Sequence, residues 1–155
     1  MSEEVLAVVK ASQPRRVFGV TMMGGLGVLL LYLALFTLPE FHWRLFLLAV
    51  AVGALYMAVA MWRATESFLE LTATELRDID GTVVARVDDI DVVERGAFAM
   101  KPSNGFVIKT RTAQPRVWRP GLWWRLGKRI AIGGVTPGAQ SKVMADTLAL
   151  LIASK

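Results

Sequence analysis

Two apolar segments near the start of the chain decide its architecture. Residues 17–38 read VFGVTMMGGLGVLLLYLALFTL, and residues 45–62 read LFLLAVAVGALYMAVAMW. Neither segment contains Asp, Glu, Lys, Arg or His, and each is long enough to cross a hydrocarbon layer of ~30 Å as a helix. The turn between them is too short to hold a domain. We therefore predict a transmembrane helical hairpin at 17–62, a polar cytoplasmic leader at 1–16 and a cytoplasmic domain at 66–155.

The charges that flank the two segments predict the topology. Lys10, Arg15 and Arg16 precede the first segment and Arg63 follows the second, whereas the turn carries one arginine, one glutamate and one histidine. Cytoplasmic flanks are the ones enriched in Lys and Arg, so both termini should face the cytoplasm in a multi-pass protein. The chain also starts without the basic region of a secretory signal peptide, so we expect the first segment to be retained as an anchor.

Small residues recur inside both segments. They are Gly24, Gly25 and Gly27 in the first segment, and Ala49, Gly53, Ala54 and Ala58 in the second. Small residues four apart let helix backbones approach closely in lipid. We expect Gly24, Gly27, Ala49 and Gly53 to serve helix packing. That packing is either internal to the hairpin or part of a docking face for another membrane protein.

The residues after the hairpin, about 90 of them, suffice for one small domain with a single core. The chain has no cysteine, which excludes disulfides, thiolate metal sites and a cysteine nucleophile. Residues 66–94 hold nine acids and two arginines, whereas residues 95–142 hold ten Lys or Arg and no acid. Basic residues near an anionic leaflet gain ~1 kcal/mol each. The alternative is that the two halves are neighbouring strands whose charges pair.

Short β-prone segments separated by turns follow the hairpin. We predict strands at 67–72, 75–79, 82–87, 90–95, 97–100, 105–112 and 128–132. Asp80-Gly81 lies between two of them, and this dipeptide is typical of a type I′ turn, whose central residues need positive φ. A short helix is expected at 5–11, within the leader.

One helix is predicted at the C-terminal end. Gly133 and Gly134 interrupt the strand pattern, Thr136 is a suitable N-cap, and Pro137 suits the first helical position. Apolar residues then recur three or four apart, as in an amphipathic helix: Val143, Met144, Leu148, Leu151 and Ile152. The predicted fold class is therefore α+β, with a two-helix transmembrane hairpin, a small antiparallel sheet and a C-terminal helix.

This element order at 66–153 resembles a pleckstrin-homology-like (PH-like) domain of the bacterial kind that is attached to membrane helices. The resemblance rests on the Asp80-Gly81 hairpin, the stretch VDDIDVV at 87–93 and the helix after Gly133-Gly134. It implies a bent antiparallel sheet or partly open β-barrel capped by the C-terminal helix, in a bacterial inner-membrane protein. The family has no fixed active site, so no catalytic residues follow. Some photosynthetic complex assembly proteins also pair membrane helices with such a domain.

Residues 115–129, the Trp/Arg segment, depart from that pattern because they are rich in tryptophan and arginine. The candidate binding residues are Arg116, Trp118, Arg119, Trp123, Trp124, Arg125, Lys128 and Arg129. Tryptophan prefers the membrane interface and basic side chains reach phosphates, which favours anionic lipid. Trp and Arg also dominate protein interfaces, and one or two tryptophans could lie in the core instead. Single-stranded nucleic acid suits the composition, but the membrane tether argues against it.

No residue pattern argues for an enzyme, a cofactor or a metal. His42 is the only histidine and has no third partner beyond Glu40. The carboxylates at 78–94 lack EF-hand spacing, and the glycines at 24–27 lack the Lys-Ser/Thr end of a phosphate loop. Segments without ionised residues also argue against a pump, transporter or proton channel.

We therefore expect a non-enzymatic membrane-anchored adaptor. Its PH-like domain would contact anionic lipid or a membrane partner through the Trp/Arg segment. The alternative is an accessory subunit or assembly factor of a larger respiratory or photosynthetic membrane complex, with another integral membrane protein as its partner.

Overall fold

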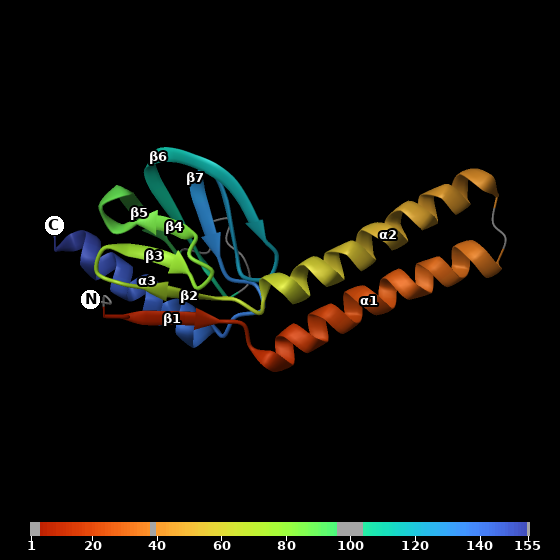
Figure 1. The fold of residues 1–155 in the computed structure, drawn as a ribbon, viewed down its shortest axis with the longest axis horizontal. Helices are drawn as coiled ribbons and strands as arrows, with labels where there is room; N and C mark the ends of the chain where they lie inside the picture. The colour runs from red at the N-terminus through yellow and green to blue at the C-terminus, as the bar shows by residue number, and fades with distance from the viewer. Residues whose placement is uncertain (1–3, 38–39, 96–103, 155) are drawn as a thin grey trace.

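The computed structural model describes residues 4–37, 40–95 and 104–154. In this part of the chain, two long helices run side by side and project from a domain of antiparallel strands and one further helix (Figure 1). The helices are α1 (Gln13–Phe36), α2 (Phe41–Ala64) and α3 (Gly138–Ala153). The strands are β1 (Ala7–Lys10), β2 (Phe68–Leu71), β3 (Glu75–Asp78), β4 (Val83–Arg86), β5 (Ile90–Glu94), β6 (Phe106–Arg119) and β7 (Trp123–Ile132), with a 3₁₀ turn, η1 (Val87–Asp89), before β5. The α+β class is confirmed.

Helices α1 and α2 are long and apolar enough to cross a membrane. Each has 24 residues, which corresponds to a length of ~36 Å. Only 11% and 17% of their most apolar windows are buried within the protein, so neither helix lies in the core of the domain. Their exposed apolar side chains indicate membrane association.

The residues before the hairpin form a strand, so the helix expected at 5–11 is wrong. β1 pairs antiparallel with β2, with Ala7 opposite Leu71 and Lys10 opposite Phe68. Burial alternates along β1, which is the two-residue period of a strand, and a helix this short would be marginal on its own. The helical hairpin is thus inserted between the first two strands of the domain, and β1 belongs to the domain together with the later strands (Figure 1).

Helices α1 and α2 pack through small residues. The buried alanines of the pair are Ala34, Ala51, Ala54, Ala58 and Ala64. A Cβ added to Gly27 would lie 2.7 Å from Leu55 Cγ, and one added to Gly24 would lie 4.0 Å from Ala58 Cβ. Gly27 is therefore a point of close helix approach, as expected where packing drives association.

The other two predicted packing residues lie elsewhere on α2. Ala49 and Gly53 are exposed, and a Cβ added to Gly53 would meet no described atom within 4 Å. Both residues therefore face away from α1, and the contact inside the hairpin uses the Ala54 side of α2 instead.

The strands form two antiparallel sheets, and the described residues do not close into one barrel. One sheet has the order β1-β2-β3-β4 and the other the order β5-β6-β7. β6 and β7 are longer than the strands predicted at 105–112 and 128–132, because they continue through the Trp/Arg segment as one long hairpin. The strand predicted at 97–100 lies outside the described residues.

In the described ranges, one hydrophobic core lies between the sheets and α3. Its largest fully buried side chains include Trp123, Phe106, Leu69, Leu71, Ile108, Ile130, Met144 and Leu148. α3 packs against β1 and β5. Its N-cap is Pro137, so the prediction of Thr136 as cap is wrong, and Thr136 Oγ1 instead lies 3.3 Å from Ser141 Oγ. Val143 is exposed, because the buried face of α3 runs through Met144 and Leu148.

The hairpin predicted at Asp80-Gly81 is present, but its turn differs from type I′. Asp78 N donates to Thr82 O at 2.8 Å, which leaves three residues in the loop. Gly81 has φ of +97°, whereas Asp80 has no positive φ. Only one residue thus needs the left-handed region, as in a three-residue hairpin loop that ends on glycine.

Candidate functional site

The Trp/Arg segment forms the outer half of the β6–β7 hairpin, beside the base of α2 (Figure 1). Arg119 lies opposite Trp123, and Trp118 lies opposite Trp124. Because side chains alternate across a strand, the eight predicted binding residues divide between the two faces of this hairpin.

Trp123 belongs to the core. Its side chain is only 1% exposed, and its Nε1 donates to Asp78 Oδ2 at 2.9 Å. The Ser67 hydroxyl donates to the other oxygen of the same carboxylate. The indole N–H is therefore satisfied inside the domain, and Trp123 is not available to lipid or to a partner.

Arg125 is also structural. Its guanidinium donates to the carbonyl oxygens of Val83 and Val84 at 2.9 Å and to Pro115 O at 2.8 Å. It thereby joins the second sheet to β4, the edge strand of the first sheet. Burial lowers the pKa of Arg125 from its ordinary value. Its place in the predicted binding set has no support from this geometry.

The remaining residues of the segment are at least partly accessible. Trp118 is 45% exposed and forms a cross-strand pair with the half-buried Trp124. Arg116 and Lys128 are exposed, and Arg129 is half-buried opposite Lys109. Leu126, two residues after Trp124, is 59% exposed. An aromatic pair with basic and apolar neighbours thus lies on the outer surface of the β6–β7 hairpin.

Arg16, which the sequence marked only as a topology signal, joins the start of α1 to the end of α2. Its side chain is 8% exposed and its guanidinium carbon lies 3.7 Å from the centre of the Trp62 ring. It donates to Thr65 Oγ1 at 2.8 Å and to Trp62 O at 2.9 Å, and Glu66 lies 3.6 Å away. The start of α1 is therefore fixed against the end of α2.

Three further contacts connect this junction to the loops of the domain. Ser12 N donates to Val135 O at 2.8 Å, and the Arg15 guanidinium donates to Thr136 O at 2.9 Å. A Cβ added to Gly121, in the β6–β7 turn, would lie 3.0 Å from Thr65 Cγ2. The domain thus has a defined position on the base of the helices.

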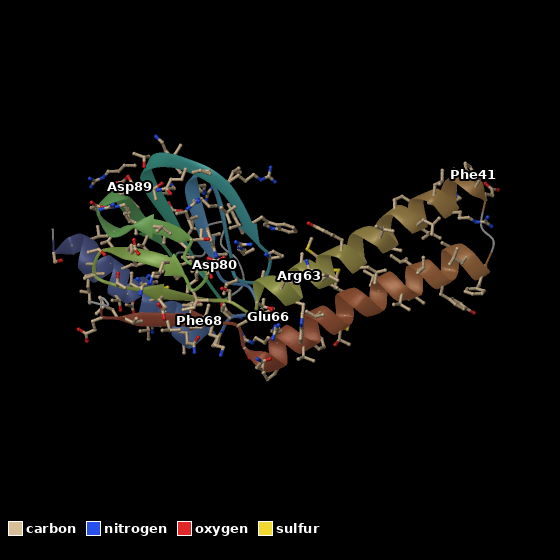
Figure 2. The ribbon with its side chains drawn as sticks, viewed as in Figure 1. Phe41, Arg63, Glu66, Phe68, Asp80 and Asp89 are labelled. Carbon is tan, nitrogen blue, oxygen red and sulfur yellow. The ribbon has the colours of Figure 1, made fainter. Side chains whose placement is uncertain are left out.

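A groove of about 510 Å³ opens between α2 and the domain. Its walls come from α2, the β3–β4 turn and the end of β6, and they include Tyr56, Val59, Arg63, Glu66, Asp80, Trp118 and Arg119. Figure 2 shows Arg63, Glu66 and Asp80 together where α2 meets the sheets. This recess therefore combines apolar helix surface with four charged groups.

Of the two arginines in the groove, Arg119 is paired with a carboxylate of the described residues and Arg63 is not. Arg119 donates to Asp80 Oδ2 at 3.1 Å. The pKa of Asp80 lies below its ordinary value of 3.8, chiefly because the backbone amide of Thr82 donates to its carboxylate, with Arg119 a smaller contribution. Asp80 is therefore ionised at neutral pH. Among described residues, the side chain of Arg63 has no hydrogen-bond or ion-pair partner.

Sequence reasoning found Trp118 and Arg119 but missed the residues opposite them. None of these residues has a distinctive local sequence pattern. Tyr56 lies inside an apolar segment, Arg63 is a basic residue that flanks that segment, and Asp80 is a turn residue. Only the position of the domain on α2 brings them together.

Within the described ranges, no three His, Cys, Asp or Glu side chains gather as a metal site. His42 Nε2 lies 3.6 Å from Glu40 Oε2 in the exposed turn of the helical hairpin. The chain matches no protein-family model, no curated protein and no solved structure.

Proposed function

We propose that this protein is a non-enzymatic membrane-anchored adaptor. The helical hairpin crosses the membrane twice, and the domain lies against the headgroups of one leaflet. There the outer surface of the β6–β7 hairpin contacts anionic lipid. The observation that carries the proposal is the partly exposed Trp118–Trp124 pair, with basic neighbours, beside the base of a long apolar helix.

The polar ends of the helices support this placement. Trp62 and Arg63 lie at the end of α2, where interfacial aromatic and basic residues are expected. Lys10, Arg15, Arg16 and Arg63 outnumber the single arginine of the turn, so both termini are assigned to the cytoplasmic side. We assign the domain to the PH-like kind on the basis of the antiparallel sheets and the C-terminal helix. That assignment in turn implies a protein of the bacterial inner membrane.

The chain lacks cysteine, so a single introduced thiol can report on lipid contact. Leu126→Cys places the probe beside Trp124, and Leu150→Cys places a matched probe on the 72% exposed Leu150 of α3. Full-length protein in nanodiscs is treated with a water-soluble maleimide. Adding anionic lipid should slow labelling at 126 but not at 150, and salt should restore the rate because it screens exposed charges.

A further pair of substitutions assigns the effect to the basic neighbours. Arg116→Gln with Lys128→Gln, made in the Leu126→Cys background, should abolish the dependence on anionic lipid. If labelling at 126 ignores the lipid composition in the parent protein, the outer surface of the β6–β7 hairpin is not a lipid contact.

A second candidate function is an accessory subunit or assembly factor of a larger membrane complex. Ala49 and Gly53 favour it, because they are small, exposed and four residues apart on α2, which suits close contact with another membrane helix. Purification in mild detergent tests it: a bound complex should be lost with Gly53→Leu and kept with Val52→Leu.

A further inference from the structure

The groove at the base of α2 has a charged end and an apolar end, and the charged end contains groups of both signs. Arg63 and Arg119 supply two cations, whereas Glu66 and Asp80 supply two carboxylates. α2 ends at Ala64, which also lines the groove, and the C-terminus of a helix carries partial negative charge. The four formal charges that line the groove sum to zero. Asp80 is paired with Arg119, and Glu66 lies 3.6 Å from Arg16, which is outside the lining.

The apolar part of the groove continues along α2. Tyr56 and Val59 precede Arg63 by about two turns and one turn, so the wall extends ~10 Å along the helix from the charged end. Both side chains are well exposed, Tyr56 at 66% and Val59 at 51%. On the opposite side, the groove is lined by Trp118 and Pro120. A ligand that fits must therefore be amphipathic, with an apolar portion parallel to α2.

We propose that this groove binds one phospholipid whose headgroup carries a primary ammonium, with its phosphate toward Arg63 and Arg119 and its ammonium toward Asp80 and Glu66. The inference rests on the proposed function in one respect: α2 must span the membrane so that its base lies among headgroups. It goes further by naming a lipid class and a second site, which shares Trp118 with the outer surface of the β6–β7 hairpin but is otherwise built largely by α2 and the β3–β4 turn.

Charge complementarity distinguishes among common headgroups. A phosphate alone would satisfy the unpartnered Arg63, but it would place a net negative charge beside two carboxylates. A primary ammonium offsets that charge and donates hydrogen bonds, whereas the quaternary ammonium of choline has no N–H to donate. The Arg119–Asp80 pair is 40% and 42% exposed, so both side chains can be reached by a headgroup.

The test is native mass spectrometry of the full-length protein in mild detergent. Ethanolamine, choline and glycerol phospholipids with identical acyl chains are each titrated, and the single-lipid adduct is quantified. Loss of one hydrogen bond to a charged group corresponds to a weakening of about tenfold. The ethanolamine lipid should therefore bind about tenfold more tightly than the choline lipid.

Three variants separate the parts of the site. Arg63→Gln should weaken all three lipids. Asp80→Asn with Glu66→Gln should remove the preference for ethanolamine over choline and should strengthen the anionic glycerol lipid, because no carboxylate then repels its phosphate. Asn at position 80 retains the oxygen that accepts from Thr82 N, so the turn is preserved. Val59→Trp should block the apolar wall while leaving every charged group in place. Arg111→Gln, an exposed base on another part of β6, is the control and should change nothing.

The proposal is overturned if wild-type protein binds the three lipids equally, or if Val59→Trp leaves the adduct intact. Neither result depends on the cysteine experiment at 126, which reports only on the outer surface of the β6–β7 hairpin. If the protein selects among the three lipids but anionic lipid does not slow labelling at 126, the proposed anionic contact of the β6–β7 hairpin is refuted and the groove site is supported.

Discussion

Replacing Arg16 with methionine should destabilise the junction of the helices far more than the same change at Arg63. In Arg16→Met, two hydrogen bonds donated by a charged group are lost, at ~1.5–3 kcal/mol each, together with a cation–π contact of ~0.5–2 kcal/mol. The ion pair with Glu66 adds little, because that carboxylate is 61% exposed. Relief of the buried charge offsets part of the loss, and we expect a net cost of ~2–4 kcal/mol.

Arg63→Met is the matched control. It removes the same charge near the end of α2, but Arg63 has no side-chain partner among the described residues, so its effect should stay within ~0.5 kcal/mol. Arg16→Lys should fall between them, since lysine keeps the charge but not the planar guanidinium. The assay is urea unfolding of the full chain in mild detergent, followed by near-ultraviolet circular dichroism. Equal losses of unfolding free energy in the two methionine variants would refute the assignment of Arg16 as the residue that joins the start of α1 to the end of α2.

Three other results are expected. Asp78→Ala should cost ~2–4 kcal/mol, because it leaves the buried Trp123 N–H without an acceptor, whereas Asp78→Asn should cost less; the urea midpoint measures both. In sealed vesicles, an impermeant maleimide should label His42→Cys and Leu150→Cys from opposite sides, and labelling of both from one side would contradict a spanning hairpin. The pKa of Asp80 is depressed on folding, so its contribution to stability is complete above pH 3.8 and is lost as the pH falls through the lower folded-state value. Asp80→Asn should therefore flatten the acid limb of a plot of thermal midpoint against pH below 3.8, and an unchanged slope would exclude this role.

Local sequence patterns predicted much of the fold. The two apolar segments, the strands after the hairpin and the helix at the end of the chain each carry a signal within their own residues. Chain continuity then sets their order. β1 was missed because four residues have too weak a pattern of their own, and its strand partner, β2, lies beyond the whole helical hairpin.

In the Trp/Arg segment, amino-acid composition does not predict which side chains are buried. Trp123 and Trp124 are neighbours of the same type, yet one is in the core and the other is half-buried on the outer face. Alternation along a strand causes this difference, and a strand was not predicted there. A signal did exist: Pro120-Gly121 marks a turn, with Gly121 at φ of +85°. Reading it would have predicted the β6–β7 hairpin and placed Trp123 and Arg125 on one face.

The insertion of the helices between β1 and β2 means that the domain is not separable from α1 and α2. Only Ala11 and Ser12 connect β1 to α1, and β1 contributes the fully buried Val9 to the core. A fragment that begins at residue 66 would lose that strand and uncover the edge of β2. The groove would disappear as well, because one of its walls is α2. A change in the tilt of α2 must in turn act on β2, since only 65–67 intervene. The same short connections that hold the domain in place therefore couple the groove, the helices and the core into one unit.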